Sequence, residues 1–209
     1  MRAIGRLAFT MPIPVDRIMK NKILCFIEDA RNVCTLILCI LLLTACASGV
    51  QQGAYPLQTV SFIDLQRYMG TWYEIARYPH RFQEGCVGTT ATYSLRDDGK
   101  VDVLNQCYKG KLDGEAVKAH GNAWVVEPAT NAKLKVSFFW PFSGHYWIID
   151  IGEHYEYAIV GHPERRYLWI LSRSPEMDDQ LYNDIIEKLK KQSYDTSKLI
   201  RTPQMKKTK

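Results

Sequence analysis

Few side chains in this sequence have the types and spacing that catalysis or metal binding requires. The histidines, five in all, are scattered from His80 to His162, and no two have the spacing of zinc ligands on one helix or turn. The sequence lacks a Gly-x-Ser-x-Gly turn, a His-Glu-x-x-His motif, a phosphate-binding Gly-Lys-Ser/Thr loop and a Cys-x-x-Cys pair. Asp97 and Asp98 are adjacent turn acids, whereas acid–base catalysis needs carboxylates placed across a cleft. We therefore predict a protein that is not an enzyme and has no metal site.

The cysteine with the clearest chemical role is Cys46, which follows an apolar run over residues 32–45. The run has the length of a signal peptide and is too short to cross a hydrocarbon core of about 30 Å as a helix. Leu43-Thr44-Ala45-Cys46 resembles the lipobox of bacterial lipoproteins, where a peptidase cuts before the cysteine and the cysteine is lipidated. We therefore expect Cys46 to carry diacylglycerol and palmitate, several chains that together anchor stably. A buried helix with a chance cysteine is the alternative.

The segments on either side of Cys46 are consistent with lipidation. We expect residues 1–45 to be a signal peptide, with Met19 as an alternative start, and residues 46–59, which contain Ala, Ser, Gly and Gln after Cys46, to be a flexible lipidated tether. Without residues 1–45 the chain keeps 21 basic and 19 acidic side chains, so its net charge is +2 rather than +5. This near neutrality argues against a nucleic-acid partner, which requires a concentrated basic face.

Two further cysteines, Cys86 and Cys107, fall in the part of the chain that is expected to fold. They lie near the outer ends of two segments rich in β-branched and aromatic residues, 89–95 and 101–108, with Asp98-Gly99 as a hairpin-turn signal between them. In an exported chain this arrangement predicts one disulfide at the open end of the hairpin. Two free buried thiols are the alternative, because sequence does not fix the register.

Segments of similar composition recur at short spacing through most of the remaining chain. The predicted strands span residues 70–78, 89–95, 101–108, 116–126, 132–139, 145–151, 155–161 and 167–173. Eight antiparallel strands with short connections close into a barrel that holds either side chains or one small ligand. The predicted fold is therefore all-β, an eight-stranded antiparallel up-and-down barrel.

One helix is predicted near the C-terminus, where Leu181, Ile185 and Leu189 recur at a spacing of four and form one apolar stripe. Asp178 and Asp179 suit its start, because acidic side chains are favourable at the positive end of the helix dipole. We expect this helix to pack on the outside of the barrel. A helix lying on a membrane surface is the alternative.

Some predicted strands are apolar on both faces, which indicates that both faces are covered. Residues 145–151 carry large apolar side chains on both parities, as do residues 167–171. The helix would cover one face, and the other would enclose either a packed interior or a ligand. The aromatic side chains that we expect to line an apolar cavity are Trp124, Phe138, Trp147 and Tyr157.

Two motifs carry a resemblance to a known family. Gly70-Thr71-Trp72 resembles the Gly-x-Trp signature on the first strand of lipocalins, and the segment ending at Arg173 is similar to the arginine motif of their last strand. The resemblance covers about residues 60–203, which would form one lipocalin domain followed by a basic tail over 204–209. It implies that Gly70, Trp72 and Arg173 are structural, with Arg173 packed across the Trp72 ring at the base of the barrel.

The form of the family that this chain resembles is the bacterial outer-membrane lipocalin related to apolipoprotein D. The resemblance implies a lipid-anchored protein of the outer membrane with its barrel in the periplasm, which binds fatty acids or lysophospholipids and stores or transports them for envelope maintenance. No cofactor is implied, and a homodimer stays open. A structural lipoprotein with a filled barrel and a lipocalin-fold enzyme acting on an apolar substrate are the alternatives.

Overall fold

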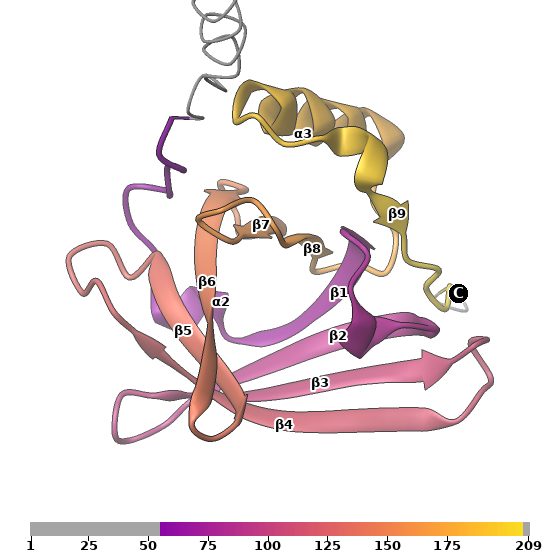
Figure 1. The fold of residues 1–209 in the computed structure, drawn as a ribbon, viewed down its shortest axis with the longest axis horizontal. Coiled ribbons are helices and arrows are strands. Elements are labelled where there is room, and N and C mark those ends of the chain that lie inside the picture. Colours follow the sequence, from indigo (N-terminus) through magenta and orange to yellow (C-terminus); the bar gives the residue numbers. More distant parts are fainter. Residues whose placement is uncertain (1–54, 207–209) are drawn as a thin grey trace, which may run out of the picture. The chain divides into compact units, whose positions relative to one another are not determined.

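The computed structural model describes residues 55–206, and these form a closed β-barrel (Figure 1). Successive strands pair antiparallel, and β1 pairs with both β2 and β8, which closes the sheet. The barrel strands are β1 (Gly70–Arg77), β2 (Cys86–Leu95), β3 (Val101–Lys109), β4 (Ala116–Val125), β5 (Lys133–Phe139), β6 (Phe142–Ile151), β7 (Tyr157–Gly161) and β8 (Leu168–Ser172). The predicted eight-stranded antiparallel up-and-down barrel is confirmed.

Short elements that the sequence analysis did not predict complete the structure. A ninth strand, β9 (Ile200–Arg201), pairs antiparallel with the end of β1. Two residues are too few to show the alternation of apolar and polar side chains that predicts a strand. A one-turn helix, α2 (Leu65–Tyr68), precedes β1, and single turns of 3-10 helix lie at η2 (Arg81–Gln83) and η3 (Thr196–Lys198).

The predicted C-terminal helix is α3 (Asp179–Lys191), and it packs outside the barrel. The side chain of Asp178 caps it by accepting hydrogen bonds from the backbone N–H groups of Gln180 and Leu181. Within residues 55–206, no helix has both the length and the apolar character that are needed to span a bilayer.

Two apolar clusters lie on the two faces of the barrel wall. The outer cluster lies between the wall and α3, and its buried members include Ile75, Tyr157, Ile159, Ile170, Ile185 and Leu189. The inner cluster fills part of the barrel, and its buried members include Tyr68, Trp72, Tyr93, Val103, Ile148 and Leu171. Two covered faces explain why strands such as β6 and β8 are apolar on both parities.

The chain before β1 belongs partly to the barrel. Leu57, which was predicted to lie in the tether, is buried in the outer cluster, and the N–H of Val60 donates to the carbonyl of Ile148. The folded part therefore begins before residue 60. Cys46 and the predicted signal peptide lie outside the described residues.

The barrel has two distinct ends. At the sealed end, β1 begins and β8 finishes, and α2 lies beside them. At the opposite end, here called the loop end, the connections are residues 78–85, 110–115, 140–141 and 162–167.

Candidate functional site

The sealed end is closed by Trp72 and Arg173, the two residues of the family motifs. Trp72 is fully buried, and its indole N–H donates to the carbonyl of Tyr68. The guanidinium of Arg173 lies 3.8 Å from the centroid of the Trp72 ring and donates to the carbonyls of Thr71, Arg67 and Tyr68 at 3.0, 2.8 and 3.1 Å. These contacts tie β8 to α2 and β1. They cover the Trp72 ring, which is fully buried, at this end of the barrel.

Gly70 makes room for this arrangement. Its φ is +92°, a conformation that favours glycine, and a Cβ atom at this position would lie 3.3 Å from Nη1 of Arg173. The Gly-x-Trp signature therefore combines a backbone conformation that favours glycine, at Gly70, with the Trp72 ring on which Arg173 packs.

Three tyrosines form a floor above the seal. The hydroxyl of Tyr146 is 2.7 Å from that of Tyr68 and 2.9 Å from that of Tyr93. Burial raises the pKa of Tyr93 to about 12 and raises the pKa of Tyr68 and of Tyr146 well above the usual value. The three hydroxyls are therefore neutral, and this part of the interior is packed without charge.

The interior becomes accessible to solvent between this floor and the loop end. On β4, Ala123 and Gly121 are buried. They face inward, because they pair with Val101 and Val103, which belong to the inner face. Ala119 and Val117 are the next two residues of the same parity, and both are exposed, Val117 to 38%. Along β4, the inward face is therefore buried toward the sealed end and exposed to solvent toward the loop end.

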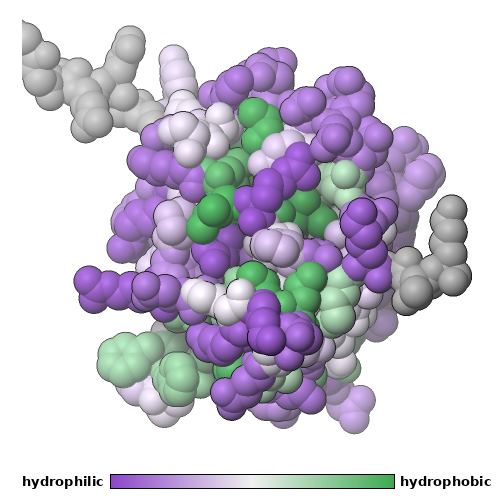
Figure 2. All heavy atoms as spheres, turned by 90° about the vertical axis from the view of Figure 1, so that its right-hand side faces the viewer, coloured by the Kyte–Doolittle hydropathy of each residue, from purple (hydrophilic) through white to green (hydrophobic). Residues whose placement is uncertain are grey.

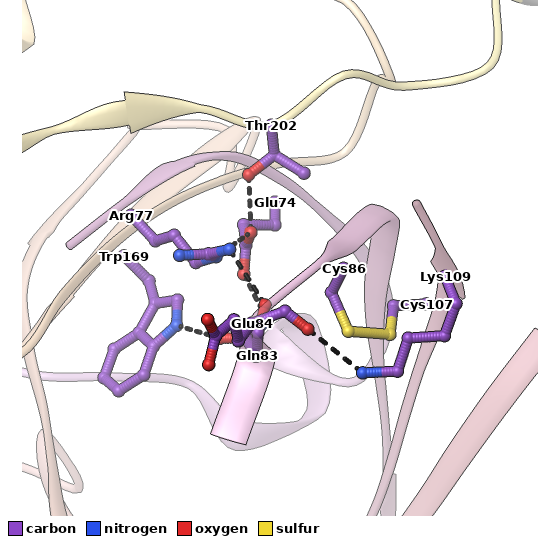
Figure 3. The surroundings of a disulfide bond; sticks show 9 residues. All are labelled: Glu74, Arg77, Gln83, Glu84, Cys86, Cys107, Lys109, Trp169 and Thr202. Atoms are coloured by element: carbon purple, nitrogen blue, oxygen red, sulfur yellow. Dashed lines mark hydrogen bonds and ion pairs between the residues drawn. A yellow bond between two sulfur atoms is a disulfide. The ribbon is translucent and has the colours of Figure 1, made fainter. Parts of the chain in front are cut away.

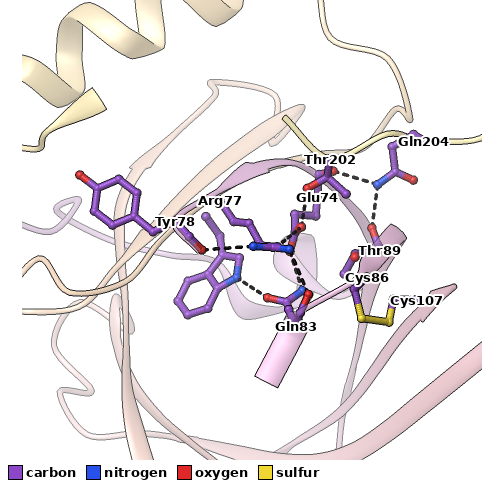
Figure 4. A network of polar contacts seen from close by, with 10 residues as sticks. Glu74, Arg77, Tyr78, Gln83, Cys86, Thr89, Cys107, Thr202 and Gln204 are labelled. Carbon is purple, nitrogen blue, oxygen red and sulfur yellow. Dashed lines mark hydrogen bonds and ion pairs between the residues drawn. A yellow bond between two sulfur atoms is a disulfide. The ribbon is translucent and has the colours of Figure 1, made fainter. Parts of the chain in front are cut away.

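A polar network lies on the inner face near the loop end (Figure 4). Glu74 follows Trp72 by two residues and pairs with Leu171, so its side chain lies on the inner face of β1. Its carboxylate is 3.2 Å from Nε of Arg77 and accepts hydrogen bonds from Gln83 and Thr202. Both charged residues are buried, at 2% and 7% exposure. Burial raises the pKa of Glu74, against the pull of these donors.

Gln83 links this network to the connection that crosses the loop end. It lies on η2, donates to Glu74 at 2.8 Å and accepts from the indole N–H of Trp169 at 3.0 Å. Its backbone carbonyl accepts from Arg77 at 3.0 Å. Side chains of β1 and β8 therefore hold the β1–β2 connection on the inner face.

The C-terminal segment fills the gap where β1 and β2 separate. The N–H of Thr202 donates to the carbonyl of Ile75, and the N–H of Gly88 donates to the carbonyl of Pro203. The amide of Gln204 donates to the carbonyls of Glu74 and Thr89 (Figure 4). Gln204, the first residue of the predicted basic tail, is therefore attached to the barrel, because its side chain supplies hydrogen bonds that the separated strands no longer make to each other.

Cys86 and Cys107 form a disulfide at the loop end, as predicted (Figure 3). Their Cα atoms are 5.5 Å apart, and the bond links the start of β2 to the end of β3. Beside it, Lys109 donates to the backbone carbonyl of Glu84. The disulfide therefore fixes the hairpin next to the polar network.

Of the four predicted cavity aromatics, Phe138 is the one on the inner face. It packs against the inner cluster and lies over Gly121, where a Cβ atom would come within 2.8 Å of its ring. Tyr157 is buried in the outer cluster instead and contacts Lys188 of α3, and Trp147 packs against the same cluster. Trp124 lies between the inward-facing Ala123 and Val125, so it points outward. These three predictions are wrong because aromatic identity does not reveal which face of a two-sided strand is inside.

The aromatic residues of the inner cluster that the sequence analysis missed are Tyr68, Tyr93, Tyr146, Tyr155 and Trp169. Glu74, Arg77 and Gln83 were missed as well. One signal could have identified Glu74, since it lies two residues after Trp72 and so shares its face of the strand. Nothing in the sequence marks Gln83, whose partners come from the fold.

The surface also offers space outside the barrel. A groove of about 370 Å³ lies mainly over the outward faces of β2, β3 and β4 and is lined by Thr92, Ser94, Asp102, His120 and Asn122 among others. Figure 2 shows the side of the molecule toward which the β3 arrow of Figure 1 points. Hydrophobic residues are visible in the middle of this face, which is otherwise largely hydrophilic. Across residues 55–206, no three His, Cys, Asp or Glu side chains are grouped as metal ligands would be.

Comparison with known proteins gives the same assignment as the two end motifs. A family model described as a lipocalin-like domain matches residues 63–204. Outer membrane lipoprotein Blc of Escherichia coli (strain K12) is 42% identical over 159 residues, which cover 76% of this chain and 88% of that protein. Apolipoprotein D of Macaca fascicularis is 33% identical over 150 residues, which cover 68% and 77%.

A solved structure agrees in fold. Insecticyanin from the tobacco hornworm Manduca sexta superposes with a TM-score of 0.58 at 25% identity, covering 72% of this chain and 85% of that one. The match over residues 63–204, together with the Trp72–Arg173 seal and the closed barrel, shows that this chain belongs to the lipocalin-like family.

Proposed function

We propose that the protein binds a lipid with one acyl chain, a fatty acid or a lysophospholipid, inside the barrel between the tyrosine floor and the loop end. The observation that carries this proposal is the exposure of Val117 and Ala119 on the inward face of β4, next to buried Gly121 and Ala123. A barrel filled throughout would bury all four. Phe138 on the neighbouring strand β5 and Trp169 on β8, across the barrel, supply apolar surface on the inner face.

The free energy available to such a ligand is sufficient. Each buried methylene contributes about 0.8 kcal/mol, so a chain with about ten buried methylenes gains about 8 kcal/mol before ordering costs. The headgroup would lie toward the loop end, where polar side chains face inward. Among these, Oδ1 of Asn105 is buried and has no hydrogen-bond partner among the described residues, so it can accept one from a headgroup.

The cellular role proposed here is storage or transport of that lipid by an anchored protein of the bacterial outer membrane, with the barrel in the periplasm. Support comes from the lipobox-like sequence at Cys46 and from relatives in three bacterial species that are named as outer membrane lipoproteins. The anchor is tested with Cys46→Ala, which should move the protein from the membrane to the soluble fraction. Continued membrane retention would argue against lipidation at Cys46.

Ligand binding is tested by native mass spectrometry of the protein purified from cells. We expect a bound acyl lipid, and after its removal we expect added lysophospholipid to bind at micromolar concentration. A protein that carries no lipid and takes up none at that concentration would instead be a structural lipoprotein with a filled barrel.

A further inference from the structure

The turn between β5 and β6 exposes three large aromatic side chains. Phe139, Trp140 and Phe142 are 78%, 87% and 77% exposed. Hairpin tips are usually made of polar residues and glycine, because exposed aromatic surface is unfavourable in water. Three neighbouring aromatics at one tip therefore indicate a surface that contacts something apolar.

A fourth exposed aromatic lies on the other side of the same end. Phe82 on η2, in the β1–β2 connection, is 66% exposed. In the closed strand order, the β1–β2 and β5–β6 connections are separated by two strands in each direction, so they lie across the barrel from each other. We call these two connections with their four aromatics the aromatic rim. It flanks the end at which the interior opens.

The chain that leads to Cys46 meets the barrel at this end as well. The guanidinium of Arg165, in the β7–β8 connection, donates to the carbonyl of Tyr55 at 2.7 Å and to that of Gln192 at 2.7 Å. Eight residues separate Tyr55 from Cys46, and a fully extended chain of that length reaches about 30 Å. A lipid on Cys46 would thus hold the loop end, rather than the sealed end, close to the bilayer.

We propose that the aromatic rim inserts into the interfacial region of the bilayer that carries the anchor, so that the open end of the barrel faces the membrane surface. Trp and Phe suit this partner, because aromatic side chains partition into the zone between headgroups and acyl chains. This inference rests on the proposed anchor and lipid ligand. It adds the route of exchange, in which a single-chain lipid passes between bilayer and barrel through the rim.

The test uses the anchored protein reconstituted in vesicles of phosphatidylethanolamine and phosphatidylglycerol whose acyl chains carry bromine, a short-range quencher of tryptophan emission. We expect bromine to quench the wild-type emission and expect Trp140→Phe to remove the greater part of this quenching. Trp124→Phe is the matched control. Trp124 points outward from the wall of β4 and is not part of the rim, so this variant should keep the quenching.

The possible outcomes distinguish docking of the aromatic rim on the bilayer from lipid anchoring at Cys46. A protein that does not float with the vesicles overturns both. A protein that floats, but whose quenching is the same with and without Trp140, overturns the docking and leaves the anchor standing. A dimer in which a second copy covers the rim would also leave Trp140 unquenched and would overturn the docking.

Discussion

Replacement of Arg173 tests how the sealed end is held closed. In Arg173→Ala, three hydrogen bonds to the carbonyls of Thr71, Arg67 and Tyr68 are lost, together with the stacking on Trp72. At about 1 kcal/mol for each hydrogen bond and about 1 kcal/mol for the cation–π contact, the free energy of unfolding should fall by about 4 kcal/mol. For a domain of this size that corresponds to a decrease in Tm of about 8–16 °C.

The lysine variant distinguishes charge from shape at the same position. Arg173→Lys keeps the positive charge but loses the planar fork that reaches several carbonyls at once, so about half of the loss, about 2 kcal/mol, is expected. Arg96→Ala is the control, because Arg96 makes ion pairs with Asp98 and Asp102 at the exposed end of a hairpin and should change stability little. Urea unfolding monitored by tryptophan emission gives each value. An Arg173→Ala protein within about 1 kcal/mol of wild type would refute the reasoning.

Two further predictions concern the loop end. Cys86→Ser/Cys107→Ser should lower the free energy of unfolding by about 3 kcal/mol, from the loop closed by residues 21 apart, and urea unfolding of wild type with and without reductant should show the same difference. Burial lowers the pKa of His80 from 6.5 to about 4, so the unfolded chain binds a proton in this range that the folded chain does not, and stability should fall as pH drops from 6.5 to 4. The expected loss is about 1.5 kcal/mol, half of the full linkage value because the ring is partly exposed. His80→Phe, which keeps the stacking on Phe82, should remove this part of the pH dependence, and an unchanged profile would exclude His80 as its source.

The architecture could be predicted because its signals are local. Runs of β-branched and aromatic residues between turn signals identified all eight barrel strands to within a few residues, and the spacing of Leu181, Ile185 and Leu189 identified α3. Asp98-Gly99 placed the hairpin that brings Cys86 and Cys107 together.

The inward face could not be predicted, for two physical reasons. The outer cluster, which includes residues of α3, covers part of the wall, so Tyr157 is buried and Trp147 is partly buried on the outer face. Bulges also shift the pairing, for example between Ile148 and Asp150, and each shift exchanges the parity of the residues that follow. The polar network could not be predicted from local sequence patterns, because its members Glu74 and Thr202 are 128 residues apart.

Substitutions at two adjacent residues of β4 test the central claim, that lipid binds inside the barrel. Ala119 faces inward and is exposed, whereas His120 faces outward and lines the surface groove. Both positions are open to solvent, so Ala119→Trp and His120→Trp should each fold with nearly unchanged stability. In a fluorescence titration with lysophospholipid, Ala119→Trp should weaken binding at least about tenfold, a loss of about 1.4 kcal/mol, and His120→Trp should bind as wild type does. The opposite result, binding retained in Ala119→Trp and lost in His120→Trp, would place the ligand in the outer groove and contradict the account.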